Sequence, residues 1–208
     1  MKFKCSANYI AVVGALLFAL PAAAQEFSAQ GISHDSAGNT TTSKVYASGG
    51  KVRIESQGVA PNSGPPDSRG SYSILDLAQQ TSFVIDPARK VVLQQPPARA
   101  RTNLAEFTAG ADPCAKFRNP GTSGIGTCAK IGVEMLNGRT ADRYEVKEGL
   151  GGQPYNVNLW IDSRLHIVLK MEMPRGMSYE LRELREGPQP AALFEIPADY
   201  QKLIMPGR

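Results

Sequence analysis

Residues 155–186 decide the fold of this chain, and they read YNVNLWIDSRLHIVLKMEMPRGMSYELRELRE. Apolar residues alternate with polar ones in three runs, 155–162, 165–173 and 177–186. Strict alternation is typical of strands that bury one face. The stretch therefore predicts three antiparallel strands joined by tight turns at 162–164 and 174–176. In the middle run, the pattern assigns five apolar residues to a single face, namely Leu165, Ile167, Leu169, Met171 and Met173.

The same alternation continues over most of the chain and predicts a mainly β fold. One helix is expected at 98–108, where Leu104 and Phe107 have helical spacing. Many strands in sequence order with short turns favour an incomplete antiparallel β-barrel, or a strongly curved sheet, with one or few helices against its concave face. A two-sheet sandwich is the alternative. The further strands are expected at 26–34, 40–47, 51–55, 71–76, 81–86, 90–94 and, around Asn137-Gly138, at 131–136 and 139–147.

The first 24 residues have the pattern of a signal peptide. Lys2 and Lys4 precede an apolar run at 9–20, and small residues at 22–24 form a cleavage site after Pro21. About 12 apolar residues are too few to span a bilayer, which needs about 20. We therefore expect one domain over residues 25–208, exported to the periplasm and soluble, without stable membrane insertion once the leader is cleaved.

Charge argues against a nucleic-acid partner. The formal net charge is +4, and two of the lysines lie in the leader. The remaining Lys and Arg residues are spread along the chain and do not form a basic cluster.

Two cysteines remain after the leader, Cys114 and Cys128, and an even pair in an exported protein predicts a disulfide. Closing a loop of this size stabilises the folded state by about 3 kcal/mol. A redox-active CxxC motif is excluded by the spacing, and the pair has too few neighbouring ligands for a metal site. We therefore interpret it as a structural crosslink.

No sequence pattern indicates catalysis. The chain has only His34 and His166, far apart in sequence, and it lacks nucleophile and metalloprotease motifs. Asp76 and Asp86 occupy turns, where Asp favours local hydrogen bonding. Trp160 lies on the polar side of its strand, either packed beneath a loop or lining a ligand groove. We expect no enzyme, no metal and no cofactor.

Several segments resemble the LolA/LolB-like superfamily of exported proteins, which includes periplasmic lipoprotein carriers. The resemblance spans most of the chain after the leader and implies an incomplete barrel around helices, with an apolar cavity that holds acyl chains in the carriers. Two features depart from the family: the helical content is small, and His166-Ile167 stands where relatives often have Leu-Pro. The matching segments are 43–55, 74–92, 138–146, 159–162 with the strand after it, and 194–200.

The function expected from these features is a non-catalytic periplasmic binding or carrier protein for a lipophilic ligand, such as an acyl chain or a lipoprotein. The alternative is an envelope interaction or sensing module that binds a protein partner without lipid, through its sheet edge or the loop at 57–70. The expected ligand-cavity residues are Leu104, Phe107, Leu159, Ile161, Ile167, Leu169 and Met171.

Overall fold

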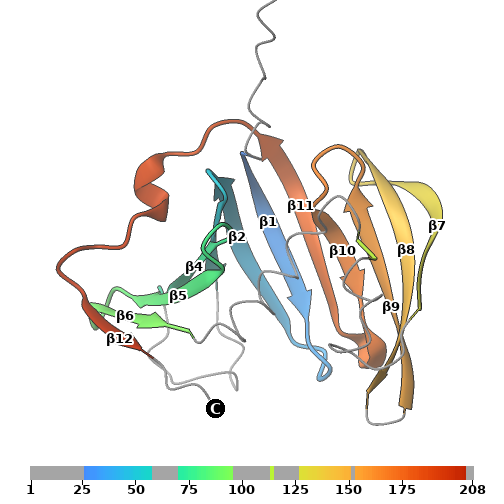
Figure 1. The fold of residues 1–208 in the computed structure, drawn as a ribbon, viewed down its shortest axis with the longest axis horizontal. Coiled ribbons are helices and arrows are strands. Elements are labelled where there is room, and N and C mark those ends of the chain that lie inside the picture. The colour runs from blue at the N-terminus through green and yellow to red at the C-terminus, as the bar shows by residue number, and fades with distance from the viewer. Residues whose placement is uncertain (1–25, 58–69, 96–112, 115–126, 151–152, 205–208) are drawn as a thin grey trace, which may run out of the picture.

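A computed structural model of the chain describes residues 26–57, 70–95, 113–114, 127–150 and 153–204. They form one open sheet of 12 strands (Figure 1). This confirms the mainly β, strongly curved sheet and decides against a two-sheet sandwich. The helix expected at 98–108, with Leu104 and Phe107, lies outside the described residues. The strands are β1 (Phe27–His34), β2 (Thr40–Ser48), β3 (Lys51–Gln57), β4 (Tyr72–Asp76), β5 (Thr81–Asp86), β6 (Val91–Gln94), β7 (Thr127–Leu136), β8 (Arg139–Leu150), β9 (Gln153–Asp162), β10 (Val168–Glu172), β11 (Ser178–Glu186) and β12 (Gln201–Ile204).

Two antiparallel meanders make up the sheet, and they meet where β1 pairs with β11. The strand order is β12-β6-β5-β4-β3-β2-β1-β11-β10-β9-β8-β7. Neighbours are antiparallel except β12, which pairs in parallel with β6. The two described 3-10 helices are short: η2 (Pro174–Gly176) lies between β10 and β11, and η3 (Ala191–Phe194) follows β11.

Turn residues explain why consecutive strands reverse so tightly. Asn137 and Gly138 both have positive φ, 52° and 77°. Two consecutive positive φ angles give a hairpin turn whose twist matches the flanking strands. The predicted Asn-Gly hairpin between β7 and β8 is therefore confirmed.

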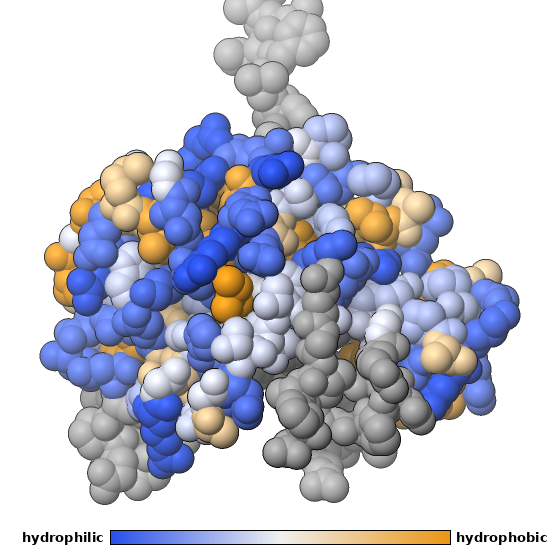
Figure 2. Space-filling model, turned by 180° about the vertical axis from the view of Figure 1, so that it is seen from behind, coloured by the Kyte–Doolittle hydropathy of each residue, from blue (hydrophilic) through white to orange (hydrophobic). Residues whose placement is uncertain are grey.

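Opposed residues show how the sheet separates an apolar face from a more polar one. Phe27, Ala47, Val52 and Leu75 oppose one another across β1 to β4, and all four are buried. We call the side that carries this row the apolar face. The neighbouring row across the same strands includes Arg53 and points the other way. Figure 2 shows the molecule from behind, where hydrophilic residues cover most of the centre.

The alternation predicted for residues 165–173 is wrong in one respect. Leu165 lies in a turn, His166 has a φ of 53°, and β10 begins only at Val168. A bulge interrupts the pairing with β9 between Val168 and Lys170, so that Val168 opposes Ile161. One extra residue reverses which side chains face the core. The five apolar residues therefore do not form one uninterrupted row, and Leu165, Ile167 and Leu169 pack in one core cluster whereas Met171 packs in another.

The segment after β11 covers the opposite face of β3 to β6. The guanidinium of Arg53 donates to the carbonyl oxygen of Leu193 at 2.8 Å and lies 3.5 Å from the ring centroid of Tyr72. Ile196 and Tyr200 pack on a small core formed by three buried residues, Ile74, Ile85 and Val92. Residues 191–200 thus form an apolar hook, which covers one end of the sheet and continues into β12.

Candidate functional site

The five expected ligand-cavity residues that the structure describes fall into two groups. Ile167 and Leu169 are 3% and 2% exposed and belong to the large core cluster around Phe27 and Leu181. Leu159, Ile161 and Met171 belong to a second cluster on β8 to β10. Ile167 and Leu169 precede Lys170, where regular pairing with β9 resumes after the bulge, whereas Met171 follows it.

The second cluster forms the better candidate for a ligand surface. Met171 opposes Leu159 on β9 and Tyr179 on β11, and Tyr179 opposes Ser33 on β1. Since Ser33 alternates in step with Phe27, this row lies on the apolar face. We call the cluster the β8–β10 patch. Its buried members are Val146, Leu159, Ile161 and Val168, and its partly buried members are Cys128, Tyr144, Val157 and Met171.

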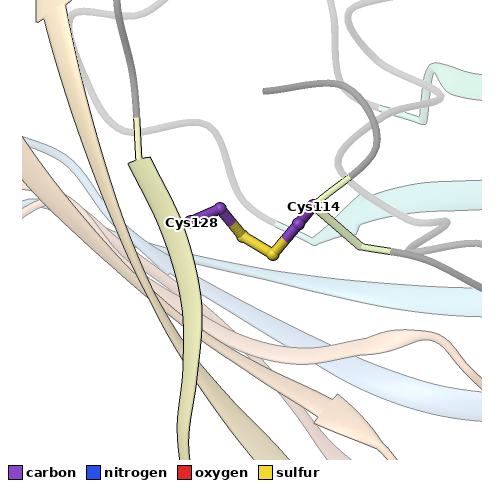
Figure 3. The surroundings of a disulfide bond; sticks show 2 residues. All are labelled: Cys114 and Cys128. Atoms are coloured by element: carbon purple, nitrogen blue, oxygen red, sulfur yellow. A yellow bond between two sulfur atoms is a disulfide. The ribbon is translucent and has the colours of Figure 1, made fainter. Parts of the chain in front are cut away.

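A disulfide lies against this patch and joins Cys114 to Cys128, as predicted (Figure 3). The two Cα atoms are 5.5 Å apart. Cys114 is 8% exposed, and Cys128 packs on the patch from the start of β7. The crosslink therefore holds residue 114, which comes from outside the sheet, beside the strand that borders the patch.

Trp160 lies on the other side of β9 and is only 6% exposed. It opposes Arg143 and Lys170, whose cationic groups lie 5.1 and 4.7 Å from the indole ring. The indole N–H donates to the Oε2 of Glu134, and Arg143 donates to the other oxygen of the same carboxylate. The hydrogen bond from Trp160, followed by that from Arg143, lowers the pKa of Glu134. A ring covered in this way packs beneath charged neighbours and does not line a groove.

A hollow of about 330 Å³ lies under the hook, and no sequence pattern indicated it. Lys51 and Asp76 oppose each other across β3 and β4 at its rim, and no ion pair joins these two residues. Asp76 is 8% exposed and accepts a hydrogen bond from the backbone N–H of Gln79. Three charged residues line this hollow, whereas the members of the β8–β10 patch are apolar, so we prefer the patch for an acyl chain. The lining residues are Lys51, Ile74, Asp76, Phe83, Phe194, Glu195 and Ile196.

The polar residues considered for chemistry lie apart from one another. His34 bonds to Thr40 at the end of β1, whereas His166 lies in the turn before β10. Asp76 and Asp86 stand at opposite ends of the β4–β5 hairpin, and each accepts a backbone N–H from its own turn. Among the described residues, no group of three or more His, Cys, Asp or Glu side chains could hold a metal ion. In the same residues, no helix is long and apolar enough to cross a membrane.

Comparison with known proteins found structures of similar fold but no match in sequence. No family model matches the chain, and no curated protein matches it in sequence. An uncharacterized conserved protein from Thermus thermophilus is 13% identical with a TM-score of 0.51, over 88% of this chain and 91% of that one. PNGF-II is 8% identical with a TM-score of 0.51, over 88% of this chain but only 31% of its own. At these identities the similarity concerns the fold alone.

A LolA superfamily protein from Nitrosomonas europaea is also among the matches. It is 10% identical, and the match covers 85% of this chain and 91% of that one with a TM-score of 0.33.

Proposed function

We propose that this protein is a non-catalytic periplasmic binding or carrier protein, and that a lipophilic ligand lies against the β8–β10 patch. The observation that carries the proposal is the incomplete burial of this patch. Tyr144, Val157 and Met171 are only partly buried on the apolar face, around Leu159, which is 5% exposed. Apolar side chains in this state gain free energy when further apolar surface covers them.

The chemistry of the patch favours an apolar ligand over a polar one. Its members offer aliphatic, thioether and aromatic surface, and methionine adapts to ligands of different shape. The resemblance to lipoprotein carriers suggests an acyl chain or a lipoprotein as the ligand. Leu104 and Phe107 lie outside the described residues, and the proposal does not depend on them.

Export to the periplasm has two supports. The N-terminal 24 residues have the pattern of a cleavable leader. The disulfide between Cys114 and Cys128 suits an oxidising compartment.

A fluorescent fatty-acid probe tests the proposal. Wild-type protein should bind the probe saturably, and Met171→Ala should weaken binding roughly tenfold while the melting temperature changes little. Leu169→Ala is the matched control, because it is 2% exposed in the other cluster. It should cost about 2–5 kcal/mol of stability and leave the affinity of the folded protein unchanged.

Two results would count against the ligand site. Equal loss of probe binding in both variants would remove the β8–β10 patch from the proposal. Absence of saturable binding by the wild type would remove the carrier function and leave the alternative, a module that binds a protein partner without lipid.

A further inference from the structure

Strand β7 forms one edge of the 12-stranded sheet and pairs, among the described strands, only with β8 (Figure 1). It is 10 residues long, whereas β12 at the opposite edge has 4. A free edge presents backbone N–H and C=O groups that another strand can bond, and long apolar edges are therefore prone to pair.

Three large apolar side chains lie exposed on this edge strand. Ile131, Val133 and Met135 are 50%, 57% and 68% exposed. Val133 and Met135 occupy alternate positions after the bulge between Lys130 and Gly132, so they share one face, and Ile131 is the extra residue of the bulge itself. Val133 opposes Asp142, which opposes Ile161 of the patch, so this face is the apolar one.

We propose that β7 pairs antiparallel with β7 of a second copy of this chain, about a two-fold axis through Val133. Val133 then opposes its own equivalent, and Ile131 opposes the second copy's Met135. The three exposed apolar residues thereby cover one another completely in pairs, as cross-strand neighbours do in a sheet.

Charge is compatible with this register. Glu134 opposes Gly132, and Lys130 lies before the bulge, outside the regularly paired part of β7 that follows the bulge, so no like charges meet. A two-fold axis through Gly132 would place Lys130 opposite Glu134 instead. The bulge disfavours that arrangement, because Lys130 opposes Tyr144 and Glu134 opposes Ala141, two β8 residues that point to opposite faces. The Glu134 carboxylate also already accepts from Trp160 and Arg143.

Sedimentation velocity over a concentration series tests the pairing. Pairing through one edge gives a small interface of the weak class, so the series should reach roughly 500 µM. Wild-type protein should shift from monomer to dimer, and Val133→Lys should remain monomeric. Ile204→Lys is the matched control, because Ile204 is 78% exposed on the other edge. It should dimerise like the wild type.

Cysteine crosslinking tests the register independently of the lysine variants. Under mild oxidation, Val133→Cys should form a dimer linked by a disulfide, because the two copies of residue 133 oppose each other. Ile131→Cys alone should not, whereas a mixture with Met135→Cys should. A wild-type protein that stays monomeric, a Val133→Lys variant that still dimerises, or a Val133→Cys variant that fails to crosslink would each overturn the proposal.

Discussion

Trp160 donates its indole N–H to the Oε2 of Glu134 at 2.9 Å, and this hydrogen bond ties β9 to the edge strand β7 across β8. Glu134 is exposed, whereas Trp160 is buried. The contact therefore joins a solvent-facing carboxylate to the core. It also helps to fix the orientation of the strand that carries the proposed dimer interface.

Trp160→Phe should raise the pKa of Glu134 towards its usual value. The indole hydrogen bond is the largest cause of the lowered pKa, and the bond from Arg143 is the second. Both favour the charged carboxylate. NMR titration of the Glu134 side chain measures the change, and Arg143→Gln, which removes both a hydrogen bond and a charge, should also raise the pKa. An unchanged titration in Trp160→Phe would show that the hydrogen bond does not control this group.

Most strands could be predicted because their apolar residues alternate and their turns contain Gly, Asn or Asp. The side of the sheet to which each residue of β10 points could not be predicted. Ile167, Val168 and Leu169 are three consecutive apolar residues, and such a run fits either phase of the alternation. The position of a bulge, which adds a single residue to one strand, therefore cannot be recognised from this apolar run. The candidate ligand surface consequently lost Ile167 and Leu169 and gained Val146, Val157 and Tyr144.

The pairing of strands that are far apart in the sequence could not be predicted either. The junction of β1 with β11 joins residues such as Gly31 and Leu181, and no local turn signals their contact. Strand β12 has only four residues, Gln201–Ile204, all exposed, so it shows no alternation between buried and exposed positions. Its parallel pairing with β6 depends on the hook that precedes it.

Gly31 lies on the apolar face at a position where even a Cβ atom would be too close to its neighbours. A Cβ at this position would lie 2.5 Å from the Oγ of Ser43, its opposed residue on β2. Gly31→Ala should therefore destabilise the protein by about 1–3 kcal/mol. The double variant Gly31→Ala/Ser43→Ala removes the clashing oxygen and should recover most of that loss. Denaturant unfolding of both variants provides the measurement.

Gly132→Ala is the matched control for Gly31→Ala. Gly132 is also a strand glycine, but a Cβ there would meet nothing within 4 Å. Its substitution should change stability by less than about 0.5 kcal/mol. If both alanine variants are equally stable, close packing against Ser43 is not the reason for glycine at position 31.

Asp162 closes the turn between β9 and β10 and is 2% exposed. Its Oδ1 accepts the backbone N–H groups of Arg164 and Leu165 at 2.9 and 2.7 Å. Its Oδ2 accepts from Arg139, which also donates to Glu186. Burial alone would raise the pKa of Asp162, but the bonds from Arg139, Leu165 and Arg164 outweigh it and lower the pKa.

Asp162→Asn should lower the free energy of unfolding at pH 7 by roughly 3 kcal/mol, because it breaks a buried ion pair. A lowered folded-state pKa means that the carboxylate stabilises the fold above the unfolded value of about 3.9. This contribution disappears as the pH falls through the folded-state pKa. The difference between wild type and variant should therefore shrink below about pH 4, as urea unfolding at several pH values would measure. Asp199→Asn, at an exposed pair with Lys90, is the control and should leave stability nearly unchanged. A gap that persists undiminished at low pH would contradict the assignment of this stability to the charged form of Asp162.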